Sequence, residues 1–363
     1  MPETTVPTNR SRPPSARASH TKVKRAVPTN VLIPTRGWPA IQYWLNRKLR
    51  RRPDLVPALN SAEQQAHDRQ VMQANSTAEL RQLTDIVPSA TVVFIGVKGA
   101  AATTATTIYD ATVLSELTRS VTVVLDANPA SGDSAARLGK DHGQTMSIQD
   151  IAQELAAGNN LDQFKDFIKR IRPTRYGVRV ITATAIVDGN NRVPVALMEK
   201  ILHVTQTQCE YLMVDTANDI TDPVTLAVVD ASTVLVFTAN VAVPASLRQL
   251  ATSMETLRRH GFADKVNNGV VVISNLPAGA DLDSYRVFLN RVNLKDEVQE
   301  LYPFEGPFLG VPHDPEIALD GEVNLEPLAW ETLQAYREVN IAWLKQVTTE
   351  GTSLQSVSQG ESS

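Results

Sequence analysis

The stretch TVVFIGVKGAAATTATT, residues 91–107, decides the fold of this chain. It begins with an apolar run of strand length, passes through a turn of small residues and ends in a Thr-rich segment that opens a helix. This order is typical of a phosphate-binding loop, because backbone N–H groups and the macrodipole at a helix N-terminus attract anions. Against the pattern G-x-x-x-x-G-K-[ST], Thr104 holds the last place, whereas Val97, Ala102 and Thr103 replace the two Gly and the Lys. The stretch alone predicts only strand, turn and helix.

Three later apolar runs also end in polar residues. The run from residue 121 ends at Asp126 and Asn128, the run from residue 209 ends at Asp215, and the run from residue 269 ends at Asn275. Ligands of open parallel α/β sheets bind beyond the carboxyl ends of the strands. We therefore expect these side chains to gather around the first loop as one site.

In order and spacing these motifs resemble the MinD/ParA family of P-loop ATPases, particularly the MinD-like proteins associated with type VII secretion and some conjugative systems. The resemblance covers about residues 35–347. The family's deviant Walker A motif, K-G-G-x-G-K-T-T, corresponds here to Lys98, Gly99, Ala100, Ala101, Ala102, Thr103, Thr104 and Ala105. The signature Lys is retained as Lys98, but Thr103 replaces the ordinary P-loop Lys.

This resemblance implies ATP and Mg²⁺ as cofactors and an ATPase reaction. It assigns the metal contacts to Thr104 and to Asp215, which matches the Walker B Asp. It assigns catalytic roles to Lys98 and to Asp126, the first acid of the family's D-x-D segment, whose second acid is Asn128 here. Because Thr103 carries no charge, the resemblance leaves open whether the chain hydrolyses ATP.

The same resemblance implies which residues contact the adenine base and which partners the chain binds. The Asn that reads adenine matches Asn275, and the segment FLGVPHDPEI matches the loop beside the base at Pro312 and His313. The family further implies a homodimer and a protein partner in a secretion or conjugation apparatus.

The pattern along the chain predicts an α/β fold, a mostly parallel sheet covered by helices on both faces. Apolar runs of strand length alternate with helical patterns, as in such sheets. Outside the strands already named, we expect strands over 177–184, 232–240 and 307–312. The predicted helices span residues 148–155, 161–171, 195–204, 244–260, 281–301 and 325–347.

Composition divides the chain into four predicted segments. We expect a disordered Pro- and Arg-rich arm over 1–33, a basic amphipathic helical extension over 34–85, the nucleotide-binding domain over 86–347 and a disordered polar tail over 348–363. Residues 1–52 carry a net charge of +11, so the remainder of the chain, whose total is −4, carries −15. The chain is thus a basic arm on an acidic body.

The helical pattern of residues 37–52 combines an apolar stripe with many Arg residues. Trp38, Ile41, Trp44 and Leu49 recur at helical spacing. Three uses compete: docking on the acidic body, contact with an anionic membrane, and contact with DNA. We favour docking, because two Trp side chains are costly to leave in water and the opposite charge is tethered nearby.

Other features limit the function classes. Cys209 is the single Cys, so an intramolecular disulfide is excluded and a buried thiol is expected. No apolar stretch approaches the roughly 20 residues that cross a bilayer. We therefore expect a cytoplasmic protein, peripheral at the inner face of the membrane if the arm binds lipid.

Each motif also has a local structural interpretation. Asp215 can cap a helix, Asn275 can sit in a turn, and Thr103 and Thr104 can cap the helix that they open. Taken together, the motifs favour an ATP-binding switch with weak or partner-stimulated hydrolysis. The first alternative is a pseudo-ATPase adaptor that kept the fold and its interaction surfaces, and the second is a partition protein that binds DNA nonspecifically.

Lys98 is the basic side chain on which phosphate contacts in the loop depend, because no other Lys or Arg stands between Thr91 and Thr118. In the family the corresponding Lys reaches a nucleotide phosphate across a dimer interface. We expect Lys98→Ala to abolish nucleotide binding, or the dimerisation that it supports, as measured by calorimetry and sedimentation. Unchanged ATP affinity together with an unchanged oligomeric state would contradict this assignment.

Overall fold

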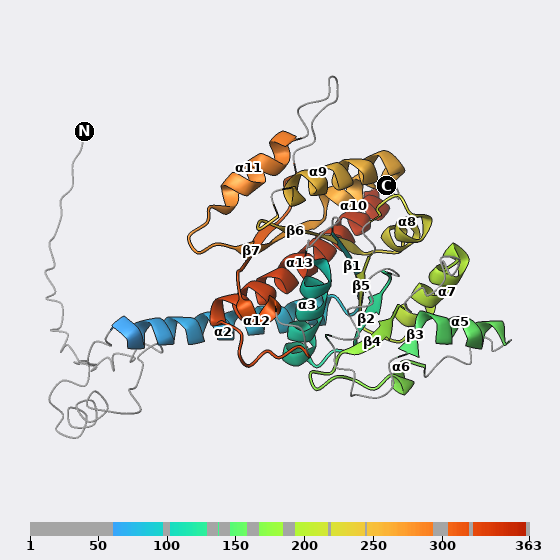
Figure 1. Ribbon diagram of the computed structural model, residues 1–363, viewed down its shortest axis with the longest axis horizontal. Coiled ribbons are helices and arrows are strands. Elements are labelled where there is room, and N and C mark those ends of the chain that lie inside the picture. The colour runs from blue at the N-terminus through green and yellow to red at the C-terminus, as the bar shows by residue number, and fades with distance from the viewer. Residues whose placement is uncertain are drawn as a thin grey trace, which may run out of the picture. The chain divides into compact units, whose positions relative to one another are not determined.

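One parallel sheet organises the part of the chain that the structure describes. The computed structural model describes residues 61–96, 102–128, 137, 146–157, 167–183, 193–216, 219–243, 245–292, 304–318 and 322–360. Within these ranges, eight strands pair in parallel in the order β3-β4-β2-β5-β1-β6-β7-β8 (Figure 1). This arrangement confirms the parallel sheet that the sequence predicts.

The strands are short and mostly buried. Their bounds are β1 Ala90–Ile95, β2 Thr122–Asp126, β3 Met146–Ser147, β4 Arg179–Thr182, β5 Tyr211–Asp215, β6 Val234–Asn240, β7 Val270–Leu276 and β8 Phe308–Pro312.

Helices connect the strands. Their bounds are α2 Ser61–Ile86, α3 Thr103–Thr118, α5 Ile148–Ala156, α6 Phe167–Arg170, α7 Val195–Gln206, α8 Pro223–Asp230, α9 Ser246–Leu257, a π-helical turn Arg258–Phe262, α10 Ala263–Asn267, α11 Leu282–Val292, α12 Pro315–Ala318 and α13 Trp330–Gly360.

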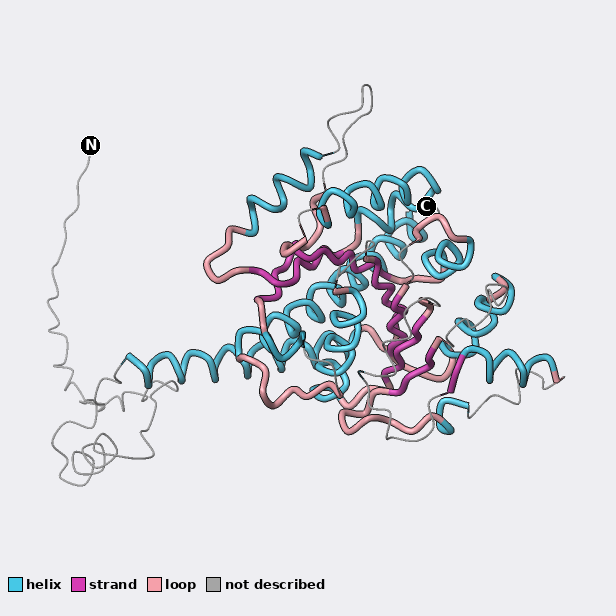
Figure 2. The backbone as a smooth tube through the Cα atoms, viewed as in Figure 1, coloured by secondary structure: helices cyan, strands magenta, loops and turns pink. Residues whose placement is uncertain are grey.

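Two apolar cores lie on the two faces of the sheet. Along β1, Val93 and Ile95 face one core, whereas Val92 and Phe94 face the other. The first core contains side chains from α5 to α11, and the second contains side chains from α2, α3 and α13. Figure 2 shows the strands lying between these helices. Burial on both faces explains why the strands read as nearly continuous apolar runs.

Helix α3, which follows the first loop, is buried on all sides. Every residue from Ala105 to Ser115 is buried. Three of its Thr hydroxyls donate to carbonyls one turn earlier: Thr107 Oγ1 to Thr103 O at 3.0 Å, Thr112 Oγ1 to Ile108 O at 2.7 Å and Thr118 Oγ1 to Leu114 O at 2.8 Å. These bonds satisfy hydroxyl groups that would otherwise be costly to bury. A Thr-rich helix can therefore lie in the core, which fixes the position of its first turn.

The chain divides into two compact units, Met1–Asp68 and Arg69–Ser363. Of the first unit, the structure describes the opening residues of α2, where Gln64 Nε2 donates to Asp68 Oδ1 at 2.8 Å. In the second unit, Leu80 and Leu83 of α2 are buried in the core that also contains side chains of α3 and α13. The arm over 1–33 and the helix over 37–52 lie outside the described residues, so these two assignments stay predictions.

Several elements differ from the sequence prediction. Helix α13 continues to Gly360, although a disordered tail was predicted from residue 348; extending an existing helix needs no new nucleus. The helix predicted over 244–260 gives way to the π-helical turn, where Gly261 has φ 93. Helix α8 was not predicted, although Asp222 accepts from the N–H groups of Val224 and Thr225 as its N-cap. Of the helix over 161–171, the described part is α6.

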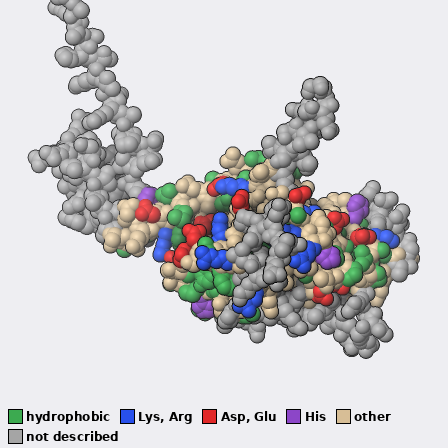
Figure 3. Space-filling model, turned by 90° about the horizontal axis from the view of Figure 1, so that it is seen from above, with side chains coloured by type: hydrophobic (Ala, Val, Ile, Leu, Met, Phe, Trp, Pro, Cys, Tyr) green, Lys and Arg blue, Asp and Glu red, His purple; other side chains and the backbone are tan. Residues whose placement is uncertain are grey.

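The described surface carries charges of both signs. On the face shown in Figure 3, Lys and Arg side chains lie interspersed with Asp and Glu. On this described surface, the large apolar side chains that are exposed are Val71, Met72, Ile86, Val287 and Phe288. Among the described residues, no helix is both long and apolar enough to span a bilayer.

Candidate functional site

The carboxyl ends of β2, β5 and β1 lie side by side at one edge of the sheet. Asp126, the last residue of β2, stands opposite Asp215, the last residue of β5. Both side chains are buried. Two acidic residues that the sequence places at separate strand ends are therefore neighbours.

Thr104 joins the start of α3 to this acidic pair. Its Oγ1 donates to Asp215 Oδ2 at 2.5 Å. This is a short charge-assisted hydrogen bond, and Asp215 is only 1% exposed. The hydroxyl and the carboxylate that the resemblance assigns to Mg²⁺ are thus in direct contact.

The residues after β2 close over the same edge. Asn128 N–H donates to Asp126 Oδ1 at 3.0 Å, and Ala127 N–H donates to Asp215 O at 2.9 Å. Asn128 is also buried. These bonds hold the segment after Asp126 against the end of β5.

Thr103 stands at the place of the P-loop Lys and contacts the neighbouring strand. Its Oγ1 lies 2.8 Å from Thr238 Oγ1 of β6, and Thr238 Oγ1 donates to Ile95 O at 3.3 Å. Thr238 is fully buried. Sequence reasoning did not identify Thr238; the available signal is a hydroxyl residue inside the apolar run of β6.

Asn275 and His313 form a second cluster. Asn275, near the end of β7, has φ 57, and its Oδ1 lies 3.1 Å from His313 Nδ1. Pro312 ends β8, and His313 N–H donates to Leu276 O at 3.0 Å. The structure therefore brings together the three residues that the resemblance assigns to the adenine base. Strand β6 separates β7 from β1, so this cluster lies apart from Thr104.

Part of the predicted site is not described. Lys98, Gly99, Ala100 and Ala101 lie outside the described residues, and their assignments stay predictions. In the part of the chain that the structure describes, no three His, Cys, Asp or Glu side chains gather as metal ligands.

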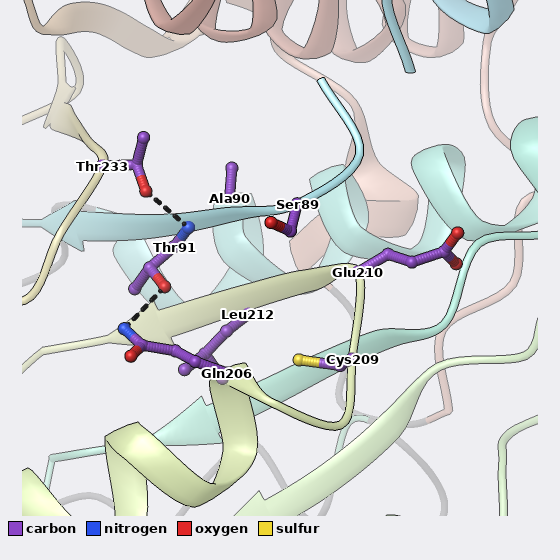
Figure 4. A pocket seen from close by; sticks show the side chains of 8 residues that line it. All are labelled: Ser89, Ala90, Thr91, Gln206, Cys209, Glu210, Leu212 and Thr233. Atoms are coloured by element: carbon purple, nitrogen blue, oxygen red, sulfur yellow. Dashed lines mark hydrogen bonds between the residues drawn. The ribbon is translucent and has the colours of Figure 1, made fainter. Parts of the chain in front are cut away.

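A pocket of about 280 Å³ opens at the opposite edge of the sheet (Figure 4). Its lining includes Thr91, Gln206 and Cys209, and Gln206 Nε2 donates to Thr91 Oγ1 at 2.9 Å. Burial raises the pKa of the Cys209 thiol to about 12. This thiol is therefore protonated at neutral pH, which agrees with a structural Cys rather than a nucleophile.

Known proteins share this arrangement of strands and helices. A ParA family ATPase from Chlorobium tepidum has a TM-score of 0.55 at 14% identity and covers 70% of this chain and 99% of its own. The cell division ATPase MinD of Pyrococcus furiosus has a TM-score of 0.50 at 13% identity and covers 72% and 99%. MinD of Pyrococcus horikoshii, solved with Mg-ADP, has a TM-score of 0.50 at 13% identity and covers 69% and 94%.

The chain has the ParA/MinD fold. No protein-family model matches it. Two curated relatives are the ESX-1 secretion-associated protein EspI from Mycobacterium tuberculosis strains CDC 1551 and H37Rv, each 23% identical over 238 residues, or 64% of this chain. The match spans about a third of the length of these relatives, 33%.

In this ParA/MinD fold the loop before α3 ends in a strained residue. Ala102 is the N-cap of α3 with φ 58 and ψ 22, in the left-handed region, and it makes no side-chain capping bond. An L-residue pays roughly 1–2 kcal/mol for this conformation, whereas Gly adopts it freely. The position where the P-loop pattern has its second Gly thus still requires a glycine-like backbone.

We expect Ala102→Gly to stabilise the chain by about 0.5–1 kcal/mol, since the relief of strain exceeds the entropy of about 0.4–1 kcal/mol that Gly adds to the unfolded chain. Urea unfolding measures this change. Ala105→Gly, three residues on inside α3, is the matched control and should destabilise by about 1 kcal/mol. A loss of stability in Ala102→Gly equal to that of the control would contradict the assigned strain.

Proposed function

We propose that the chain binds ATP with Mg²⁺ at the carboxyl edge of the sheet and acts as a nucleotide-dependent switch. The observation that carries this proposal is the hydrogen bond from Thr104 Oγ1 to Asp215 Oδ2 at 2.5 Å. The two residues come from chain segments 111 positions apart, yet the fold holds them together. They are also the pair to which the resemblance assigns the metal.

The residues at this edge fit Mg²⁺. Hydroxyl and carboxylate oxygens are hard donors, and Mg²⁺ is usually held by one or two carboxylates together with phosphates and water rather than by an all-protein cage. Two protein donors, Thr104 and Asp215, suit that mode. When bound, Mg²⁺ would neutralise charge on the β- and γ-phosphates of ATP.

Charge limits the affinity of the proposed site. A Lys ammonium about 4 Å from a phosphate is worth roughly 4 kcal/mol at an effective dielectric near 20, before its desolvation is subtracted. Thr103 forgoes this contact, and in residues 91–118 only Lys98 can replace it. We therefore infer weak binding that strengthens when a dimer or partner completes the site.

Hydrolysis in the proposed switch is slow or depends on a partner. Asp126 is the remaining carboxylate of the D-x-D segment, and its Oδ1 accepts the Asn128 N–H at 3.0 Å. Asn128 is a neutral amide, so it cannot act as a carboxylate base toward the attacking water. Asn275 and His313 supply polar groups for the base, two strand positions away from the phosphate end of the site.

In this proposal the switch acts in a secretion apparatus. This role is supported by the 23% identity with EspI, which is described as an ESX-1 secretion-associated protein. Homodimerisation and a protein partner in that apparatus complete the switch, with ATP controlling which partner is bound. The basic arm that would contact membrane or DNA lies outside the described residues.

A second candidate function is a pseudo-ATPase adaptor without nucleotide. It is favoured by the contact between Thr103 Oγ1 and Thr238 Oγ1 at 2.8 Å, which directs the residue at the P-loop Lys position toward β6. In this reading the Thr104–Asp215 bond closes the edge of the sheet, and the fold is kept for its interaction surfaces.

Calorimetric titration of the full chain with ATP and Mg²⁺ separates the two candidates. For the switch, we expect binding that Thr104→Val and Asp215→Asn each weaken by about tenfold or more, or roughly 1.4 kcal/mol. Thr112→Val is the matched control, because Thr112 lies on the same helix and its buried hydroxyl donates to Ile108 O rather than to the site. It should leave the affinity within about twofold.

Restoring the P-loop residues tests the same proposal through a gain of ATP affinity. Combining Ala100→Gly, Ala102→Gly and Thr103→Lys should strengthen ATP binding by about tenfold or more, because one recovered charge contact exceeds roughly 1.4 kcal/mol. Absence of ATP binding by the wild type at millimolar nucleotide would reject the switch and leave the adaptor. Affinities that fall equally in the Thr104 variant and the Thr112 control would also reject the proposed site.

A further inference from the structure

A carboxyl group is buried in the core between α3 and α13. Asp110 of α3 is fully buried. Trp343 Nε1 donates to its Oδ2 at 3.1 Å, and Asn340 Nδ2 donates to its Oδ1 at 2.8 Å and to its backbone O at 3.1 Å. Both donors are neutral and both belong to α13. Each oxygen of the carboxyl group thus has its own directed partner on one neighbouring helix.

Such a group is costly to keep in a core. Burial raises the pKa of the Asp110 carboxyl well above its usual range, and the Trp343 N–H offsets this effect only in part. A hydrophobic side chain of similar size would avoid the cost. Buried polar groups of this kind are best attested where they specify the register of one helix on another.

The packing around Asp110 does not set that register alone. Tyr109 and Tyr336 stack with ring centroids 5.6 Å apart, and Val339 is buried in the same core cluster. Apolar contact is non-directional, whereas hydrogen bonds weaken steeply with distance and angle. A shift of α3 by one turn, about 5.4 Å, would break every bond to Asp110.

The register of α3 in turn sets the proposed nucleotide site. Thr104 precedes Asp110 on the same helix by six residues, or about 9 Å of axial rise. The bond from Thr104 Oγ1 to Asp215 Oδ2 is 2.5 Å long, and O–H···O bonds persist only to about 3.0 Å. An axial displacement of even half a turn therefore removes Thr104 from Asp215.

We propose that Asp110 is a positioning residue, which locks α3 to the C-terminal helix α13 and thereby holds Thr104 against Asp215. The lock places α13 in the same rigid unit as the site. A partner that displaces α13 therefore loosens the first turn of α3, and completion of the site stabilises α13. The link to nucleotide rests on the proposed function, whereas the lock itself does not.

Amide hydrogen exchange on the full chain tests the lock without nucleotide. The Thr106 N–H, which donates to Ala102 O at 2.8 Å, reports whether the first turn of α3 is closed. Asp110→Asn keeps an oxygen for Asn340 but places an NH₂ group against the Trp343 N–H. We expect exchange at Thr106 to accelerate by about tenfold or more. Adding Trp343→Phe removes the opposed donor and should return the rate to within about threefold of wild type.

Val339→Ala is the matched control, because Val339 is buried on α13 and makes none of these hydrogen bonds. It should lower the free energy of unfolding. When the exchange rates are compared at equal stability, the rate at Thr106 should stay within about threefold of the wild-type rate. Equal acceleration in Asp110→Asn and in the control, or no rescue by Trp343→Phe, would overturn the lock.

ATP–Mg²⁺ affinity is the second readout. Asp110→Asn should weaken binding by about fivefold or more, while Val339→Ala leaves it within about twofold. Unchanged affinity in Asp110→Asn would overturn the positioning role. If the wild type binds no ATP, the proposed function fails, and the exchange data still decide whether Asp110 locks the two helices.

Discussion

The hydroxyl of Thr104 meets the buried carboxylate of Asp215 at 2.5 Å, and the placement of the candidate site depends on this contact. It links the helix that follows β1 to the end of β5, in the middle of the sheet. Helix α3 is buried from Ala105 to Ser115, so its first turn is anchored to the core. The same burial that stabilises the fold therefore presents Thr104 to Asp215.

The candidate site, as far as the structure describes it, combines buried carboxylates with neutral side chains. Asp126 and Asp215 lie side by side, and Thr103 is a neutral residue that contacts Thr238 at the position where the MinD/ParA motif, which this segment resembles, has a Lys. Acidic groups without the P-loop cation suit a metal ion better than they suit a bare phosphate. This combination of carboxylates and neutral side chains is consistent both with a weakly binding switch and with a nucleotide-free adaptor. Binding of ATP with Mg²⁺ distinguishes the two functions.

The sequence predicted the parts of the site that depend on strand ends. An apolar run that stops at Asp126 or Asp215 specifies both the strand and the edge where the acid emerges, so their approach follows from a parallel sheet. Asn275, Pro312 and His313 come together for the same reason.

Contacts that depend on tertiary packing were not predicted. Thr238 lies inside an apolar strand, and nothing local marks it as the partner of Thr103. Asp110 does leave a signal, a single acid within the apolar run IYDATVL, but its donors come from a helix more than two hundred residues later. Helix α13 passes the predicted boundary at residue 348, because polar composition does not stop a helix that packing has already nucleated.

A crystal structure of the chain grown with a non-hydrolysable ATP analogue and Mn²⁺, an anomalously scattering substitute for Mg²⁺, tests the proposed site most directly. We expect an anomalous peak beside the oxygens of Thr104 and Asp215, with the analogue's phosphates at the start of α3. An intact Thr104–Asp215 bond with no metal and no nucleotide at that edge, at saturating concentrations of both, would contradict it.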